Sequence, residues 1–256
     1  YTNNVMEYNT FQNFEQEAFN SKSSGDIIRY NRFLNCSGAG PIALRWGNDK
    51  MVEYNYFENV SDGIGVHGEG HRIVNNVFNG VRRDGIHIKN WGPWNRAENG
   101  SIVGETYYPP TGKILIAHNT LLNGKGSLIE IGRTVGATLK TTQLPFDIWV
   151  HNNIFAGNAS TFGPLFQFIG GKDVRVSHNV YHVTGSATVG HLGTNAFSGD
   201  PRVDTLFRPT VDSPAHNRGV DLSTLKDSAG AALPSVVFDY YGKRRATPPD
   251  IGAVEN

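Results

Sequence analysis

The stretch Glu53-Tyr54-Asn55-Tyr56-Phe57 decides the fold, because versions of it return along the whole chain. Each copy places one asparagine among apolar or aromatic residues. These asparagines are Asn9, Asn31, Asn55, Asn76, Asn119, Asn153 and Asn179. Their spacings are 22, 24, 21, 43, 34 and 26 residues, and 43 is close to two turns of about 21.5. A repeat of this length is typical of a solenoid whose turns stack on one another.

Within one repeat the apolar residues alternate with other residues, as in Ile64-Gly65-Val66 and Ile86-His87-Ile88. Alternation is the pattern of β-strands, and helical patterns of ten or more residues are absent. The sequence therefore predicts an all-β protein, a right-handed parallel β-helix with about 21–26 residues per coil. We expect the recurring asparagine to occupy a left-handed corner and to hydrogen-bond along a ladder of its copies.

The spacings also predict how the chain is divided. Residues 1–197 are expected to form the coils, interrupted by insertions near 90–112 and 133–146. Residues 198–256, where the repeat has stopped, are expected to form a C-terminal cap that packs on the β-helix. Because the chain starts at Tyr1, we expect that a leader has been removed or that N-terminal coils are missing.

Composition excludes several classes of protein. The 256 residues include 23 Lys and Arg against 23 Asp and Glu, a balance that argues against nucleic acid as a partner. No apolar run is long enough for a membrane helix. The single cysteine, Cys36, excludes an internal disulfide and a multi-cysteine zinc site. We expect a monomer that binds neither nucleic acid nor membrane.

One outward column of the predicted coils is cationic. If the isoleucines, leucines and valines of the alternating segments point inward, then Arg45, His67 and Lys89 point outward on successive coils. Lys22 stands one coil earlier in the same column. Like charges at this separation are unfavourable unless an anion lies among them, so the column predicts an acidic ligand. The alternative is ordinary surface charge that extends into water.

Further candidates surround this column. His87 belongs to the neighbouring outward column, and the first insertion contributes the aromatic residues Trp91, Tyr107 and Tyr108. Long loops in a compact domain are usually functional, and these could form the wall of a groove. We therefore expect His87, Lys89 and the three aromatic residues to contact a sugar substrate.

Residues 5–80 resemble the polysaccharide lyases of family six, which are β-helix alginate lyases and chondroitinase B. The resemblance rests on Glu15-Gln16-Glu17, on Lys22 and on Leu44-Arg45-Trp46-Gly47 at nearly the family spacing. It implies that Lys22 is the base and Arg45 the acid-side group. It also implies that Glu15 and Glu17 lie where some members hold Ca²⁺. A related alginate lyase family on the same fold is the alternative.

The chain departs from the family pattern in three places, the first of which is two extra residues between Lys22 and Arg45. Gly65 stands where the family has an arginine, so His67 or Lys89 is expected to supply the missing cation. The asparagine that would complete a calcium site falls before Tyr1. The segments Ser213-Pro214-Ala215 and Asp250-Ile251-Gly252 resemble the ending of secreted bacterial β-helix proteins, which implies a secreted or periplasmic protein.

These residues favour β-elimination from a uronate-containing acidic polysaccharide, with alginate as the first choice. A lysine base must be neutral when it removes the C5 proton, and neighbouring cations favour the neutral amine. A permanently charged arginine suits the carboxylate, and Tyr107 or Tyr108 is an alternative acid. The rival hypotheses are a uronate C5-epimerase and a non-catalytic carbohydrate-binding or adhesin β-helix. A glycoside hydrolase, which needs a pair of carboxylates, ranks behind them.

Overall fold

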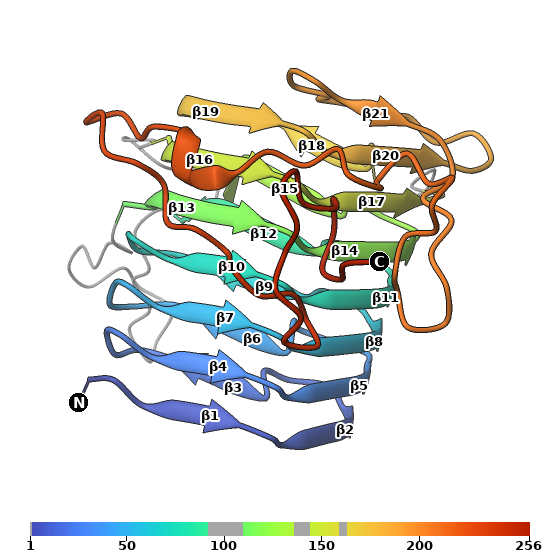
Figure 1. Ribbon diagram of the computed structural model, residues 1–256. Coiled ribbons are helices and arrows are strands. Elements are labelled where there is room, and N and C mark those ends of the chain that lie inside the picture. Colours follow the sequence, from blue (N-terminus) through green and yellow to red (C-terminus); the bar gives the residue numbers. More distant parts are fainter. Residues whose placement is uncertain (1, 92–109, 136–143, 159–162) are drawn as a thin grey trace, which may run out of the picture.

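Each recurring asparagine stands directly before a strand, and the strands stack coil upon coil into three parallel sheets (Figure 1). The computed structural model describes residues 2–91, 110–135, 144–158 and 163–256. The predicted all-β parallel β-helix is confirmed. No helix in the described part of the chain is long and apolar enough to cross a membrane.

Each complete coil contributes one strand to each sheet. The first sheet has seven strands, β1 (Val5–Glu7), β4 (Ile27–Arg29), β7 (Met51–Glu53), β10 (Arg72–Val74), β13 (Gly112–Ala117), β16 (Phe146–His151) and β19 (Lys172–Ser177). The second has eight, β2 (Thr10–Phe14), β5 (Arg32–Cys36), β8 (Tyr56–Val60), β11 (Val77–Val81), β14 (Thr120–Gly124), β17 (Ile154–Gly157), β20 (Val180–Val183) and β21 (Phe197–Ser198). The third has six, β3 (Phe19–Ser21), β6 (Ile42–Leu44), β9 (Ile64–Val66), β12 (Ile86–Trp91), β15 (Ile129–Val135) and β18 (Phe166–Phe168).

The asparagine ladder forms as predicted, at the two-residue corner between the first and second sheets, which we call the 1–2 corner. The side-chain amide of Asn55 donates to Oδ1 of Asn76 on the next coil at 3.0 Å. The same bond links every neighbouring pair from Asn9 to Asn179, at 3.0 to 3.1 Å. Because the amides also bond backbone carbonyls, these buried corners keep their polar groups satisfied.

Two details of the repeat differ from the prediction. The left-handed backbone falls on the residue before each ladder asparagine, for example Tyr54 with φ of 56°, so the asparagine itself is left to form the ladder. The spacing of 43 residues is one coil, because β10 pairs directly with β13 and Asn76 bonds Asn119. The extra residues lengthen the spacing between two asparagines without adding a coil. The interpretation of 43 residues as two turns was therefore wrong.

The interior of the coil is a continuous apolar core. Stacked phenylalanine rings run through it, with centroids 5.4 Å apart for Phe11 and Phe33, 5.0 Å for Phe33 and Phe57, and 4.2 Å for Phe57 and Phe78. The register brings these residues to one position of the second sheet. Burial of such rings, one above another, is a main source of the stability of the coils.

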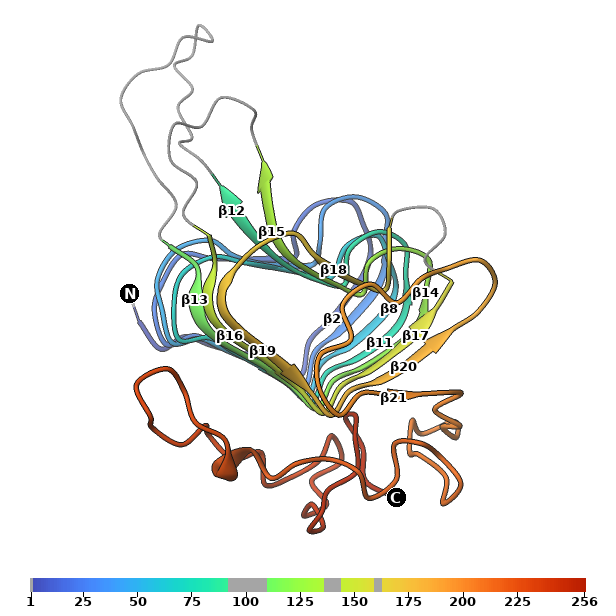
Figure 2. The same cartoon turned by 90° about the horizontal axis from the view of Figure 1, so that it is seen from above.

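The segment after β21, which we call the tail, lies along the outside of the 1–2 corner (Figure 2). It contains one short 3₁₀ helix, η1 (Leu222–Thr224). Apolar contacts fasten it to the sheets, since Leu222 and Leu233 pack with Leu115 and Trp149. The tail therefore covers the flank of the middle coils and lies away from the third sheet.

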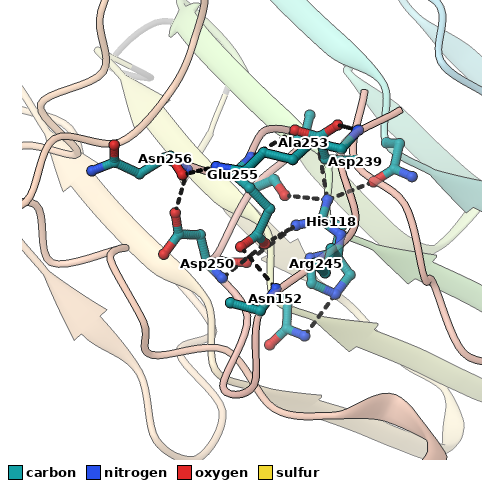
Figure 3. Close-up of polar contacts among 12 residues, drawn as sticks. His118, Asn152, Asp239, Arg245, Asp250, Ala253, Glu255 and Asn256 are labelled. Carbon is teal, nitrogen blue, oxygen red and sulfur yellow. Dashed lines mark hydrogen bonds and ion pairs between the residues drawn. The ribbon is translucent and has the colours of Figure 1, made fainter. Parts of the chain in front are cut away.

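A buried ion pair within the tail orients the guanidinium that bonds the tail to the coils (Figure 3). Arg245 Nη1 lies 2.7 Å from Glu255 Oε1, with side chains only 4% and 3% exposed. The Arg245 guanidinium also donates to Oδ1 of Asn75, a corner residue, at 2.7 Å. At another corner residue, Asn152, the side-chain amide donates to the carbonyl oxygen of Val220 at 2.8 Å. The tail thus binds the 1–2 corners through hydrogen bonds to Asn75 and Asn152.

Candidate active site

The turns from the third sheet into the first, which we call the 3–1 turns, bring three of the predicted residues into one column. The first three of these turns span residues 22–26, 45–50 and 67–71. The amide of Arg45 donates to the carbonyl oxygen of Ser21, which precedes Lys22, at 2.9 Å. The amide of His67 donates to the carbonyl oxygen of Leu44 at 2.8 Å. Lys22, Arg45 and His67 therefore begin successive turns at equivalent positions, about 4.8 Å apart along the stack.

Only part of this column faces solvent. Lys22 is exposed and the Arg45 side chain is 27% exposed, whereas His67 is only 6% exposed. The third sheet lies on the side of the coil opposite the tail (Figure 2), so the tail does not cover this face. A ligand at this place meets Lys22 and Arg45 first, and His67 offers it little surface.

Arg45 forms an ion pair that the sequence did not indicate. Its Nη2 atom bonds Oε1 of Glu17, and both side chains are partly buried. Glu17 precedes strand β3 and Arg45 follows strand β6, so the guanidinium reaches across the third sheet to the neighbouring coil. The carboxylate neutralises Arg45 locally and holds the guanidinium over this face.

The pairing of Glu17 bears on the predicted calcium site. Calcium takes six to eight oxygen ligands. Glu17 is engaged by Arg45, and Glu15, the other predicted ligand, is exposed. Within the described ranges no group of three or more His, Cys, Asp or Glu residues gathers as a metal site would require. These two residues by themselves therefore do not fit a calcium ion.

His87 occupies the neighbouring outward column as predicted, and a glycine makes room for it. The register of the third sheet places Ala43, Gly65, His87 and Glu130 one above another. A Cβ atom at Gly65 would lie 2.6 Å from Nε2 of His87, so the imidazole lies close over the glycine backbone. The absence of a side chain at Gly65 therefore decides where the ring of His87 can rest.

The remaining predicted contacts are only partly described. Lys89 and Trp91 belong to strand β12, which continues past the point where β9 turns, with a register shift after Ile88. Lys89 therefore extends a strand, whereas Arg45 and His67 each begin a turn, because β12 runs on to Trp91 while β6 and β9 end at Leu44 and Val66. Tyr107 and Tyr108 lie outside the described residues.

Sequence reasoning missed a set of buried polar residues beneath the column. Asp26, Lys50 and His71 end the three 3–1 turns, and the pairing of the strands after them sets them at one level of successive coils. Their exposed fractions are 1%, 0% and 0%. We call these three residues the buried polar column. A lysine is rarely buried without a partner, so no pattern in one sequence indicates that Lys50 points inward.

Burial controls the protonation of this buried polar column. It lowers the pKa of Lys50 to about 8, although the nearby Asp26 carboxylate opposes the shift. It also lowers the pKa of His71 to about 4, so this imidazole is neutral at pH 7. For Asp26, burial raises the pKa, but hydrogen bonds from Ser21, Ser23 and Asn4 outweigh it and bring the pKa below the ordinary value.

Comparison with known proteins supports the assignment of this fold. The family model described as chondroitinase B matches residues 2–222. No curated protein matches the chain.

Two solved structures are similar over most of the chain. A mutant of the PL6 family alginate lyase AlyGC has a TM-score of 0.58 and 18% identity, covering 98% of this chain and 32% of that one. Another structure of AlyGC has a TM-score of 0.52 and 20% identity, covering 76% of this chain and 27% of that one. The chain thus spans about a third of the length of these solved proteins.

Proposed function

The chain belongs to the chondroitinase B family, and from that premise we propose that it is a polysaccharide lyase acting on a uronate-containing acidic polymer. The observation that carries the proposal is the pair Lys22 and Arg45, which begin adjacent turns on a face that the tail leaves uncovered. Elimination next to a carboxylate requires a base near C5 and a cation near the carboxylate, and Lys22 and Arg45 are the residues proposed to supply them.

The proposed reaction is a β-elimination. Nζ of Lys22, as the neutral amine, takes the proton from C5 of the uronate. The electron pair of that C–H bond forms a double bond between C4 and C5 while the C4–O glycosidic bond breaks. The leaving oxygen takes a proton from a water molecule on the side of Arg45, the Lys22 ammonium returns its proton to the resulting hydroxide, and the products are an unsaturated uronate end and a shortened chain.

Arg45 is proposed to bind the uronate carboxylate. Its guanidinium is planar, permanently charged and suited to a two-point contact with a carboxylate. Charge that develops on the carboxylate as C5 loses its proton is stabilised by this fixed cation. The ion pair with Glu17 limits the rotation of the guanidinium, so that less order has to be gained when substrate binds.

Alginate is the polymer that we propose, because both similar structures are of an alginate lyase. We place His87 and Lys89 among the substrate contacts, together with the aromatic residues of the first insertion. Since such polymers lie outside cells, we propose that the protein acts in the periplasm or after secretion.

The test is a panel of uronate polymers incubated with the wild-type protein, with unsaturated uronate ends followed by ultraviolet absorbance. We expect absorbance to rise when the wild-type protein acts on alginate. The rate of this rise should be lower by on the order of a thousandfold in Lys22→Ala and in Arg45→Ala. Lys226→Ala, an exposed lysine of the tail, is the control and should keep full activity. No rise with any uronate polymer would reject a lyase. A changed uronate composition without double bonds would instead identify a C5-epimerase, and binding without either would identify a non-catalytic module.

A further inference from the structure

The 3–1 turns that carry the reactive residues are tied together from inside the coil. We propose that Lys50 is a positioning residue, whose buried ammonium sets the placement of Lys22 relative to Arg45. The inference rests on the proposed function, since it assigns a role in the same site. The buried polar column supplies the geometry for it.

The contacts of Lys50 join the two reactive turns. Its Nζ donates to the carbonyl oxygen of Ser21 at 3.1 Å and also to the carbonyl oxygen of Trp46. Ser21 directly precedes Lys22, and Trp46 directly follows Arg45. One ammonium therefore holds the backbone beside both reactive residues, which lie on neighbouring coils.

The carbonyl oxygen of Ser21 is a shared anchor. Besides Lys50 Nζ, it accepts the amide of Arg45 at 2.9 Å and the amide of Trp46 at 3.3 Å. These donors crowd one oxygen at the start of the first reactive turn. Removing the ammonium leaves the two amides in place but takes one of three donors from the carbonyl oxygen of Ser21, and it also takes this donor from the carbonyl oxygen of Trp46.

The groups on either side of Lys50 fix neighbouring parts of the same turns. Oδ2 of Asp26 accepts the hydroxyls of Ser21 and Ser23, at 2.5 and 2.6 Å, and these serines flank Lys22. Above Lys50, Nδ1 of the neutral His71 accepts the Lys50 amide at 3.1 Å. The Nε2–H group of His71 then donates to the carbonyl oxygen of His67 at 2.8 Å.

An apolar residue would fill the position of Lys50 at lower cost. Burying an ammonium requires desolvation, and replacing a buried charge by a well-packed apolar side chain is often neutral or stabilising. A methionine has nearly the length of the lysine stem and leaves no large cavity. In return for the cost of desolvation, the ammonium supplies two directed hydrogen bonds to the reactive turns, which an apolar side chain cannot form.

The test is a graded series at this position, Lys50→Gln and Lys50→Met, in the full chain. Lys50→Met loses both bonds, while the shorter amide of Lys50→Gln can keep one donor near the two carbonyls. We expect kcat on the best uronate polymer to fall at least tenfold in Lys50→Met and less in Lys50→Gln. We expect KM to stay within about twofold in both, because the substrate contacts on the outer face are retained. Val150→Ala, a core truncation in a distant coil, is the control for simple loss of stability and should keep kcat.

The outcomes separate this inference from the proposed function. If the wild type forms no unsaturated ends on any uronate polymer, the lyase proposal fails. If the wild type is active and a folded Lys50→Met variant keeps the same kcat, the positioning role is overturned and the lyase proposal stands. An equal fall in kcat in Lys50→Met and Val150→Ala would show that the ammonium serves stability alone. Failure of both Lys50 variants to fold would show the same.

Discussion

The 1–2 corner repeats one device in every coil, whereas the 3–1 turns differ from coil to coil. At the 1–2 corner, a left-handed residue precedes a ladder asparagine, and the asparagines form one continuous chain of hydrogen bonds. At the 3–1 turns, an aspartate, a lysine and a histidine occupy equivalent buried positions, each with its own partners. The comparison teaches that repetition stabilises the coil and that departures from repetition mark the candidate site.

The two regions also differ in what covers them. The tail lies along the 1–2 corner and contacts it through Asn75 and Asn152, while the third sheet faces away from the tail (Figure 2). If the comparison is right, damage at the covered corner lowers stability and spares catalysis, whereas damage at the 3–1 turns lowers kcat.

The largest effect on stability is expected at the buried ion pair between Arg245 and Glu255 in the tail. Arg245→Ala leaves the Glu255 carboxylate buried without its cation and should lower the free energy of unfolding by about 3 to 5 kcal/mol. The exposed neighbour Arg244 provides the control, since Arg244→Ala should change it by less than about 0.5 kcal/mol. Urea unfolding measures both variants. A large fall in kcat for folded Arg245→Ala would contradict the division of roles between the two regions.

The ladder itself is the next target. Asn55→Ala removes an amide that donates to the carbonyl oxygens of Ile28 and Glu53, at 2.8 and 3.0 Å, and to Asn76. We expect a loss of about 2 to 3 kcal/mol, because the carbonyls stay buried without their donor. Asn79→Ala, which removes the acceptor of a solvent-exposed bond from Asn123, should cost much less. Thermal unfolding compares the two, and similar losses would mean that the ladder adds little to the coil.

Acid should weaken both regions through buried histidines. The pKa of His71, at a 3–1 turn, and of His151, at the end of β16, is lowered by burial to about 4 from the ordinary 6.5. Below pH 6.5 these histidines are protonated in the unfolded chain but stay neutral in the folded chain until the pH approaches 4. The free energy of unfolding therefore falls as the pH drops below 6.5. Between pH 7 and pH 5 each histidine should contribute a loss of about 2 kcal/mol.

Urea unfolding at these two pH values tests the expectation, with His71→Gln as the comparison. The variant should lose less stability between pH 7 and pH 5 than the wild type does. An unchanged pH dependence would show that His71 takes up its proton without unfolding the turn.

The smallest effect is expected for the ion pair on the outer face. Glu17→Gln removes the partner of Arg45, and because both side chains are partly exposed, stability should change by less than about 1 kcal/mol. The guanidinium loses its fixed orientation, so kcat should fall a few-fold. Steady-state kinetics measures this, with Glu15→Gln as the matched control. An equal fall in kcat in Glu17→Gln and Glu15→Gln would favour a metal site in which the two carboxylates act together.

Much of the fold followed from local chemistry. The asparagine phrase with alternating apolar residues predicted the strands, the coil and the ladder, because these depend on residues that recur at regular positions. The site was predicted less completely. Lys22, Arg45 and His67 were identified as one column, but neither the pairing of Arg45 with Glu17 nor the burial of His67 was foreseen. These features depend on contacts between coils, which no single repeat contains.

The amino-acid sequence by itself determined the winding of this protein, since each coil is specified by its own short strands and by the asparagine at its corner. Only the tertiary structure decided the direction of each side chain at the irregular turns. Lys22 and Lys50 look alike in the sequence, yet one extends into water and the other lies wholly inside the coil. The physical reason is that the buried position offers Lys50 the carbonyl of Trp46 in its own turn and that of Ser21 on the preceding coil, and the second partner exists only once the coils are stacked.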